Sequence, residues 1–121
     1  MATVAIVGNR DGFTKEYVNA VLDKVLTIKL GQDKVISGGA NGVDTYAMEW
    51  ARNKGVSFRA FMPDMSVQSP ARYFQRNEQI AKACDVLVAF NAHAPSGTLN
   101  TVNTATKLGK EVIVIGKDFP I

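Results

Sequence analysis

The sequence predicts a doubly wound α/β domain, in which a five-stranded parallel sheet lies between two layers of helices. Strand and helix patterns alternate strictly along the 121 residues, and the strand patterns are apolar on both faces. Both features are typical of a parallel sheet that helices cover on each side. Right-handed crossovers make 3-2-1-4-5 the expected strand order, with a switch point between the first and fourth strands.

The first half of the chain supplies three strands and two helices. Glycines and a proline mark most of their ends. The expected elements are a strand over residues 3–7 closed by Gly8, a helix capped by Asp11 or Thr14 and ended by Gly31, a strand at Val35 and Ile36, a helix from Val43 closed by Gly55, and a strand over residues 56–62 stopped by Pro63.

The second half continues the alternation. Residues 64–70 are polar and irregular, so we expect a flexible loop there. The elements after this loop are a helix over residues 71–83, a strand over 85–90, a loop over 91–97, a helix over 98–108 ended by Gly109, and a strand over 111–115. Because no linker or internal repeat interrupts the pattern, residues 1–121 are expected to form one domain.

Composition and charge favour a soluble cytoplasmic protein with a small ligand. No apolar run approaches the roughly 18 residues that span a bilayer, and no signal-peptide pattern opens the chain, so no membrane partner is expected. Cys84 is the single cysteine, which suits a reducing compartment. The net charge of +3 comes from scattered Lys and Arg, which fits an anionic small ligand and is too weak to indicate nucleic acid.

Three loops are expected to meet at the carboxyl edge of the sheet, over residues 8–12, 37–42 and 91–97. All three follow strands that flank or adjoin the switch point. Ligands of doubly wound sheets bind at this place. The convergence of the three loops is therefore the main argument for a binding site.

The second of these loops is rich in glycine and runs from a strand directly into a helix. Glycine allows a tight turn and a close approach of the backbone to a ligand, and the free N–H groups of the helix's first turn attract anions. The alternative is a plain strand-to-helix turn, with Ser37 as a brace and Asp44 as a helix cap. The candidate ligand-binding residues are Ser37, Gly38, Gly39, Ala40, Gly42 and Asp44.

The first and third loops add polar groups. Arg10 carries a planar guanidinium that suits a phosphate or a carboxylate, although a solvated loop cation is the alternative. The start of the fourth helix would form a second anion cradle. His93 is the single histidine and has no Cys or His cluster beside it, so no metal site is expected. The candidate residues here are Gly8, Asn9, Arg10, Ser96, Gly97 and Thr98.

The helix before the fourth strand carries Arg72 and Arg76 on one face. Its aromatic residues, Tyr73 and Phe74, are expected to pack in the core, with stacking on a base as the alternative. Walker, Gly-x-Gly-x-x-Gly and Gly-x-Ser-x-Gly motifs are all absent. Ordinary nucleoside triphosphatases, dinucleotide-fingerprint enzymes and α/β-hydrolases are therefore disfavoured, and no cofactor is expected.

Taken together, the motifs resemble the SLOG superfamily, most closely its small single-domain branch related to YspA and YpsA. The resemblance covers nearly the whole chain. It implies a Rossmann-like sheet with a pocket for nucleotides or nucleotide-derived ligands, and it adds Arg76 and Asn77 to the ligand-binding residues. The motifs that carry it are Gly8-Asn9-Arg10, Gly38-Gly39-Ala40-x-Gly42-Val43-Asp44-x-x-Ala47, Arg76-Asn77, Asp85-x-x-x-Ala89-Phe90 and Ser96-Gly97-Thr98.

The similar LOG-type phosphoribohydrolases raise the question of catalysis. These enzymes cleave the N-glycosidic bond of a nucleoside monophosphate and carry Pro-Gly-Gly-x-Gly-Thr-x-x-Glu, with a catalytic glutamate and an arginine from the preceding helix. In this chain Thr101 stands where that glutamate would be. Threonine cannot act as a carboxylate nucleophile or stabilise developing positive charge. Catalytic residues, if any, would come from Glu78, Asp44 and Arg76.

Three functional hypotheses follow. The leading one is the binding or sensing of a nucleotide or nucleotide-derived small molecule, and the alternative is N-glycosidic hydrolysis of a nucleoside monophosphate by a displaced acid. Single-stranded DNA binding, as in the DNA-processing relatives of the superfamily, is the least favoured because those chains are larger and the charge here is scattered. A homodimer through exposed apolar positions on the third or fourth helix is also compatible with the sequence.

Overall fold

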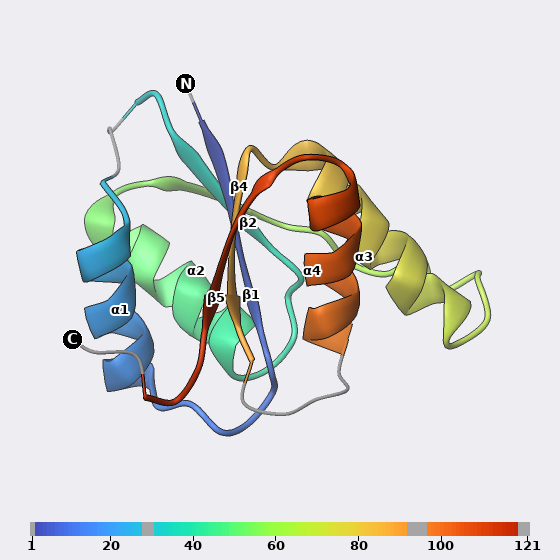
Figure 1. Ribbon diagram of the computed structural model, residues 1–121, viewed down its shortest axis with the longest axis horizontal. Helices are drawn as coiled ribbons and strands as arrows, with labels where there is room; N and C mark the ends of the chain where they lie inside the picture. The colour runs from blue at the N-terminus through green and yellow to red at the C-terminus, as the bar shows by residue number, and fades with distance from the viewer. Residues whose placement is uncertain (1, 28–30, 92–96, 119–121) are drawn as a thin grey trace.

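Five parallel strands form one sheet in the order β3-β2-β1-β4-β5 (Figure 1), which confirms the expected fold class and strand order. The computed structural model describes residues 2–27, 31–91 and 97–118. Its elements are β1 (Thr3–Gly8), α1 (Lys15–Val25), β2 (Lys34–Ser37), α2 (Val43–Lys54), β3 (Ser57–Ala60), α3 (Ala71–Ala83), β4 (Val86–Phe90), α4 (Gly97–Lys107) and β5 (Glu111–Ile115).

The sheet separates two apolar layers. Successive side chains of a strand point to opposite faces, so Ile6 packs with α1 and α2 while Val7 packs with α3 and α4 (Figure 1). The central strand β1 pairs with β2 and β4 and is buried on both faces, which explains its continuous apolar run. Phe90 is fully buried in the first layer, and burial of a side chain of this size contributes roughly 1.5–3 kcal/mol.

Helix α1 begins after Thr14, whose hydroxyl oxygen accepts a hydrogen bond from the Tyr17 N–H at 3.1 Å. Of the two caps that the sequence allowed, this is the one that forms. The helix ends at Val25, earlier than Gly31, because Leu26 turns to an extended conformation while its N–H still bonds within the helix. The expected end of this helix was therefore too late.

The described helices are 11 to 13 residues long. Helix α2 ends at Gly55 as expected, because a left-handed residue (φ 72°) there lets the N–H bond back to the Ala51 carbonyl. None of these helices has the length and the apolar composition needed to cross a membrane.

Strand β3 is shorter than the expected 56–62 because its pairing partner ends first. Its neighbour β2 stops at Ser37, and the last hydrogen bond between the two segments runs from the Phe61 N–H to the Ser37 carbonyl at 2.7 Å. Beyond that point the chain leaves the sheet, and Met62 is 63% exposed.

The loop between β3 and α3 has hydrogen bonds of its own. The Asp64 carboxylate accepts from the Ser66 N–H at 2.9 Å and from the Ser66 hydroxyl at 2.7 Å. The Arg72 side chain donates to the Val67 carbonyl at 2.8 Å. The segment that the sequence predicted to be flexible therefore follows a path defined by these bonds, and it projects from the body of the molecule together with the first turn of α3 (Figure 1).

A substitution at Gly8 tests the packing of β1 against α2. A Cβ atom at Gly8 would lie 2.5 Å from Val43 Cβ, so Gly8→Ala forces the strand and the helix apart. We expect a loss of about 1–3 kcal/mol in the free energy of unfolding, measured by urea denaturation. Gly97→Ala is the control, because a Cβ there meets nothing within 4 Å. Equal midpoints for both variants would contradict this account.

Candidate functional site

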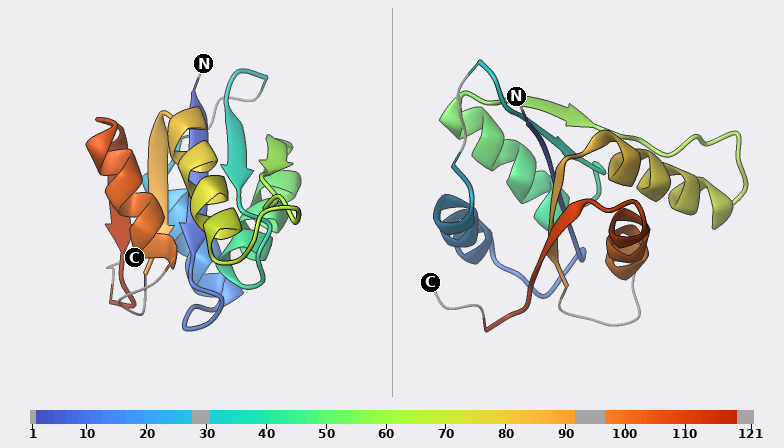
Figure 2. Two further views of the ribbon diagram at one scale, coloured as in Figure 1. Left: turned by 90° about the vertical axis from the view of Figure 1, so that its right-hand side faces the viewer. Right: turned by 45° about the horizontal axis from the view of Figure 1, so that its top comes forward.

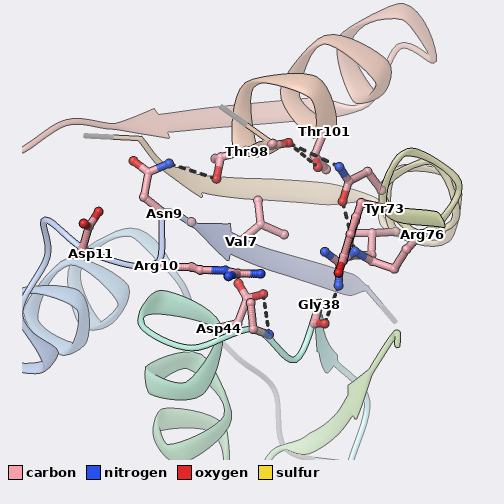
Figure 3. Close-up of a pocket in the computed structure, with 15 residues that line it drawn as sticks. Val7, Asn9, Arg10, Asp11, Gly38, Asp44, Tyr73, Arg76, Thr98 and Thr101 are labelled. Carbon is pink, nitrogen blue, oxygen red and sulfur yellow. Dashed lines mark hydrogen bonds between the residues drawn. The ribbon is translucent and has the colours of Figure 1, made fainter. Parts of the chain in front are cut away.

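A cavity of about 360 Å³ opens at the carboxyl ends of β1 and β2, beside the switch point between β1 and β4. Figure 2 (left) shows the loops that leave these strand ends gathered at one edge of the molecule. Four segments form the walls of the cavity: the loop after β1, the glycine-rich loop, one face of α3 and the start of α4 (Figure 3). The lining residues are Val7, Gly8, Asn9, Arg10, Asp11, Gly38, Ala40, Asp44, Tyr73, Arg76, Asn77, Ile80, Gly97, Thr98 and Thr101.

The cavity collects most of the residues that the sequence singled out for ligand binding. They come from positions far apart in the chain and meet because parallel strands present their carboxyl ends at one edge. Ser96 and His93 lie outside the described residues. The candidates that line the cavity are Gly8, Asn9, Arg10, Gly38, Ala40, Asp44, Arg76, Asn77, Gly97 and Thr98.

Three candidates lie behind the cavity wall and shape it. Ser37 is fully buried, and its hydroxyl donates to a main-chain carbonyl of β1 at 2.6 Å, so it braces the turn as its alternative interpretation held. Gly39 adopts φ +74°, and a Cβ there would lie 2.6 Å from Met62 Sδ. Gly42 adopts φ +79°, and a Cβ there would overlap the Arg10 carbonyl oxygen. These residues fix the path of the loop instead of facing the cavity.

Arg76 links α3 to the glycine-rich loop. Its Nη1 donates to the Gly38 carbonyl at 2.5 Å, and its Nε donates to Asn77 Oδ1 at 3.0 Å. A Cβ at Gly38 would lie 2.8 Å from Arg76 Nη1 and 2.9 Å from Asp44 Oδ2, so glycine is what lets these two charged groups flank the loop. Burial lowers the pKa of Arg76, and the neighbouring Asp44 carboxylate opposes that shift.

Asn77 links the same helix to the start of α4. This buried side chain donates through Nδ2 to Asn100 Oδ1 at 3.1 Å and to the Gly97 carbonyl at 3.4 Å. Its own oxygen is occupied by Arg76. One continuous set of hydrogen bonds therefore runs from the glycine-rich loop through α3 to the first turn of α4.

Asp44 places a carboxylate between the glycine-rich loop and the cavity. The residue is only 5% exposed, and its Oδ2 accepts from the Ala40 N–H at 3.1 Å. Its Oδ1 is buried without a hydrogen-bond partner among the described residues. Burial raises the pKa of this carboxyl group, although the Ala40 N–H, the Ser37 side chain and the Arg76 charge oppose the shift.

The start of α4 forms the wall opposite the glycine-rich loop. Asn9 donates through Nδ2 to the Thr98 hydroxyl at 3.3 Å, which joins the loop after β1 to this helix (Figure 3). Thr101 is 2% exposed and its hydroxyl donates to the Gly97 carbonyl at 3.3 Å. The position that holds glutamate in the LOG-type enzymes is therefore occupied by a neutral side chain bonded to its own helix.

Glu78 lies away from the cavity. Its carboxylate forms an ion pair with Lys82 at 2.7 Å on the exposed face of α3, and it does not line the cavity. A residue at this position points to solvent because the helix turns about 100° per residue from the buried Asn77. The structure therefore does not bring this catalytic candidate to the site.

Sequence reasoning expected Tyr73 in the core, with stacking on a base as the alternative, and did not single out Ile80. With Arg76 and Asn77 they occupy positions i, i+3, i+4 and i+7 of α3, which share one helix face. That spacing was a signal that could have found them. The other lining residues that were not singled out as ligand contacts are Val7, Asp11 and Thr101.

The environment of Asp44 predicts a pH effect on stability. A raised pKa means that the folded chain holds this proton more tightly than the unfolded chain, so wild-type stability falls as pH rises from the ordinary Asp value through the folded pKa. We therefore expect Asp44→Asn, which keeps an acceptor for the Ala40 N–H, to gain stability relative to wild type over that range. Urea denaturation from about pH 3 to pH 7 measures the difference.

Asp64→Asn is the control for this experiment. Hydrogen bonds from Ser66 lower the pKa of Asp64, so this variant should lose stability relative to wild type as pH rises. A difference between Asp44→Asn and wild type that does not change with pH would contradict the assignment.

Two sequence families match this chain. Residues 2–67 match the YspA, cpYpsA-related SLOG family, and residues 60–120 match DNA recombination-mediator protein A. No curated protein matches it significantly.

Solved structures share the fold. DNA processing protein A from Streptococcus pneumoniae superposes with a TM-score of 0.77 at 22% identity, over 93% of this chain and 50% of that protein. DNA processing protein A from Helicobacter pylori, whose structure describes a mode of single-stranded DNA binding, gives 0.71 at 21% identity, over 93% and 64%. The protein TM1055 gives 0.68 at 21% identity, over 93% and 72%. The chain thus spans about half to two-thirds of the two DNA processing proteins.

The residues that match the SLOG family include part of the cavity wall. Residues 2–67 include β1, β2 and α2, and with them the loop that carries Arg10 and the glycine-rich loop. These two loops form one side of the cavity (Figure 3). The chain belongs to the YspA, cpYpsA-related SLOG family.

Proposed function

We propose that this domain binds a nucleotide or a nucleotide-derived small molecule in the cavity at the carboxyl edge of the sheet. The observation that carries the proposal is the convergence of two arginines, the glycine-rich loop and the first turn of α4 on one cavity. Its volume of about 360 Å³ lies within the range of about 300–1,000 Å³ typical of small-molecule sites.

The anionic part of such a ligand has a place to bind. Arg10 is exposed and forms no hydrogen bond or ion pair with its side chain in the described part of the chain, so its guanidinium is available for a phosphate. Thr98 lines the same cavity from the first turn of α4, where main-chain N–H groups and the helix dipole favour negative charge. These two features together would hold a phosphate at one side of the cavity.

The chemistry of the remaining wall favours binding over turnover. Thr101 is neutral and its hydroxyl is bonded to Gly97, so it supplies no carboxylate to a sugar. Binding without cleavage is the property of a sensor or carrier, and we infer that the domain works in that way.

The proposal predicts that affinity depends on phosphate and on Arg10. AMP should bind more tightly than adenosine, and Arg10→Ala should weaken AMP binding by about tenfold or more, because a hydrogen bond to a charged group is worth roughly 1.5–3 kcal/mol. Isothermal titration calorimetry with AMP, NAD and ADP-ribose measures this. Arg52→Ala is the matched control, since Arg52 is exposed on α2 and away from the cavity. Equal affinities of the Arg10→Ala and wild-type proteins would remove Arg10 from the site.

N-glycosidic hydrolysis is a second candidate function, favoured by one observation. Of the acids that the sequence named as catalytic candidates, Asp44 lines the cavity beside Arg76 and Glu78 does not. If wild type releases ribose 5-phosphate from a nucleoside monophosphate, Asp44→Asn should lower the rate at least a hundredfold and Glu78→Gln should leave it unchanged. Proton NMR follows the anomeric signal of the product. Absence of that signal in the wild type would discard this candidate.

DNA binding and dimer formation are less favoured readings. The Helicobacter pylori relative binds single-stranded DNA, but the net charge of +3 on this chain is small and scattered. A steep loss of oligonucleotide affinity with salt would be required to support a phosphate-backbone interface.

For a homodimer, Phe74 on α3 and Leu108 after α4 offer exposed apolar surface, the two residues being 51% and 45% exposed.

A further inference from the structure

The aromatic residues of this protein divide into two groups. In the described part of the chain, all but two of them pack against one of the two core layers. The aromatic residues that do so are Phe13, Tyr17, Tyr46, Trp50, Phe58, Phe61 and Phe90. Tyr73 and Phe74 are the two that do not, which corrects the expectation that both belong to the core.

These two neighbours on α3 face different surroundings. Phe74 is 51% exposed and points to solvent. Tyr73 is half-buried and lines the cavity, on the same helix face as Arg76 and Ile80. The separation follows from the turn of about 100° between consecutive helical residues.

The Tyr73 ring is placed differently from the aromatic rings of the two core layers. It forms no ring-to-ring contact within the described residues, in contrast to Phe13, which stacks with Tyr17 and meets Phe90 edge to face. Around it the cavity wall is mixed: Val7 and Ile80 are apolar, and Arg76 brings a guanidinium. An aromatic face beside apolar side chains in an open cavity is suited to a flat, weakly polar group.

The cavity separates this aromatic surface from its anion-binding side. Figure 3 shows Tyr73 and Arg76 entering from α3, while Asn9 and Thr98 lie toward the other side and the Arg10 side chain extends between them, next to Asp44. A ligand with a phosphate at one end and a planar ring at the other matches that separation. Stacking of a base on an aromatic side chain is tolerant of base identity because every base has a π-face.

We propose that Tyr73 is the platform on which the planar heteroaromatic ring of the ligand stacks, and that it determines the preference for a nucleotide over a sugar phosphate. This inference rests on the proposed function and adds to it the orientation of the ligand: the ring lies at α3, and the phosphate lies at Arg10 and the start of α4. Tyr73 is thereby a specificity-determining residue, whereas Arg10 acts on any phosphorylated ligand.

A comparison of two ligands on four proteins tests this. Calorimetry would measure the affinities of AMP and ribose 5-phosphate for wild type, Tyr73→Leu, Tyr73→Phe and Phe74→Leu. We expect Tyr73→Leu to weaken AMP binding by about five- to a hundredfold and to change ribose 5-phosphate binding less than twofold. Tyr73→Phe keeps the ring and should bind AMP nearly as wild type does. Phe74→Leu removes a neighbouring aromatic ring outside the cavity and should change neither affinity.

Proton NMR gives a second readout that a purely structural role would not produce. Stacking on Tyr73 should shift the H2 and H8 signals of bound AMP upfield in the wild type and in Tyr73→Phe, and this shift should disappear in Tyr73→Leu. Equal weakening of both ligands by Tyr73→Leu, or no weakening of AMP, would overturn the assignment of Tyr73 while leaving the cavity as the nucleotide site. Failure of the wild type to bind AMP, NAD and ADP-ribose would overturn the proposed function itself.

Discussion

The close approach of β1 to the start of α2 is the constraint on which the rest of the site depends. Gly8 lies against Val43 so tightly that even a methyl group would overlap it, and Gly42 lies equally close to the main chain at Arg10. Two residues without side chains therefore let two loops touch backbone to backbone. If either loop were held farther away, Arg10 and Asp44 would no longer share a cavity wall. The glycines of these loops therefore first allow close packing within the protein itself, and any contact with a ligand depends on that packing.

Helix α3 forms the other side of the site and connects elements that lie far apart in the sequence. Arg76 reaches the carbonyl of Gly38, and Asn77 reaches the first turn of α4. The neutral hydrogen bonds of Asn77 contribute only about 1 kcal/mol each to stability, and the charged one from Arg76 contributes roughly 1.5–3 kcal/mol. Their value for function lies in geometry, because they hold the glycine-rich loop, α3 and α4 at fixed separations around an open cavity. A residue of this set can therefore influence a ligand that it does not contact.

The difference between this chain and the LOG-type enzymes that it resembles has a physical basis in one position. Thr101 is buried, and its hydroxyl donates a hydrogen bond to the Gly97 carbonyl of its own helix. A carboxylate at the same place would present a negative charge to the cavity. Asp44 retains a carboxylate in the cavity wall, but burial disfavours its ionised form and Ala40 already occupies one oxygen. The position of the catalytic glutamate therefore holds no acid in this chain, and the carboxylate of Asp44 already accepts a hydrogen bond from the main chain.

The amino-acid sequence by itself determined the parallel sheet, its strand order and the edge at which the candidate loops meet. Apolar periodicity and glycine positions are local, and right-handed crossovers leave few topologies, so these features can be read along the chain. Only the tertiary structure decided which side chains face the cavity. The Ser37 hydroxyl bonds to β1, the Glu78 side chain points to solvent, and Tyr73 lines the cavity instead of packing in the core. Such outcomes depend on the distance and rotation of elements that are remote in sequence. Helical spacing shows which residues of α3 share a face, but not what that face meets in the folded protein.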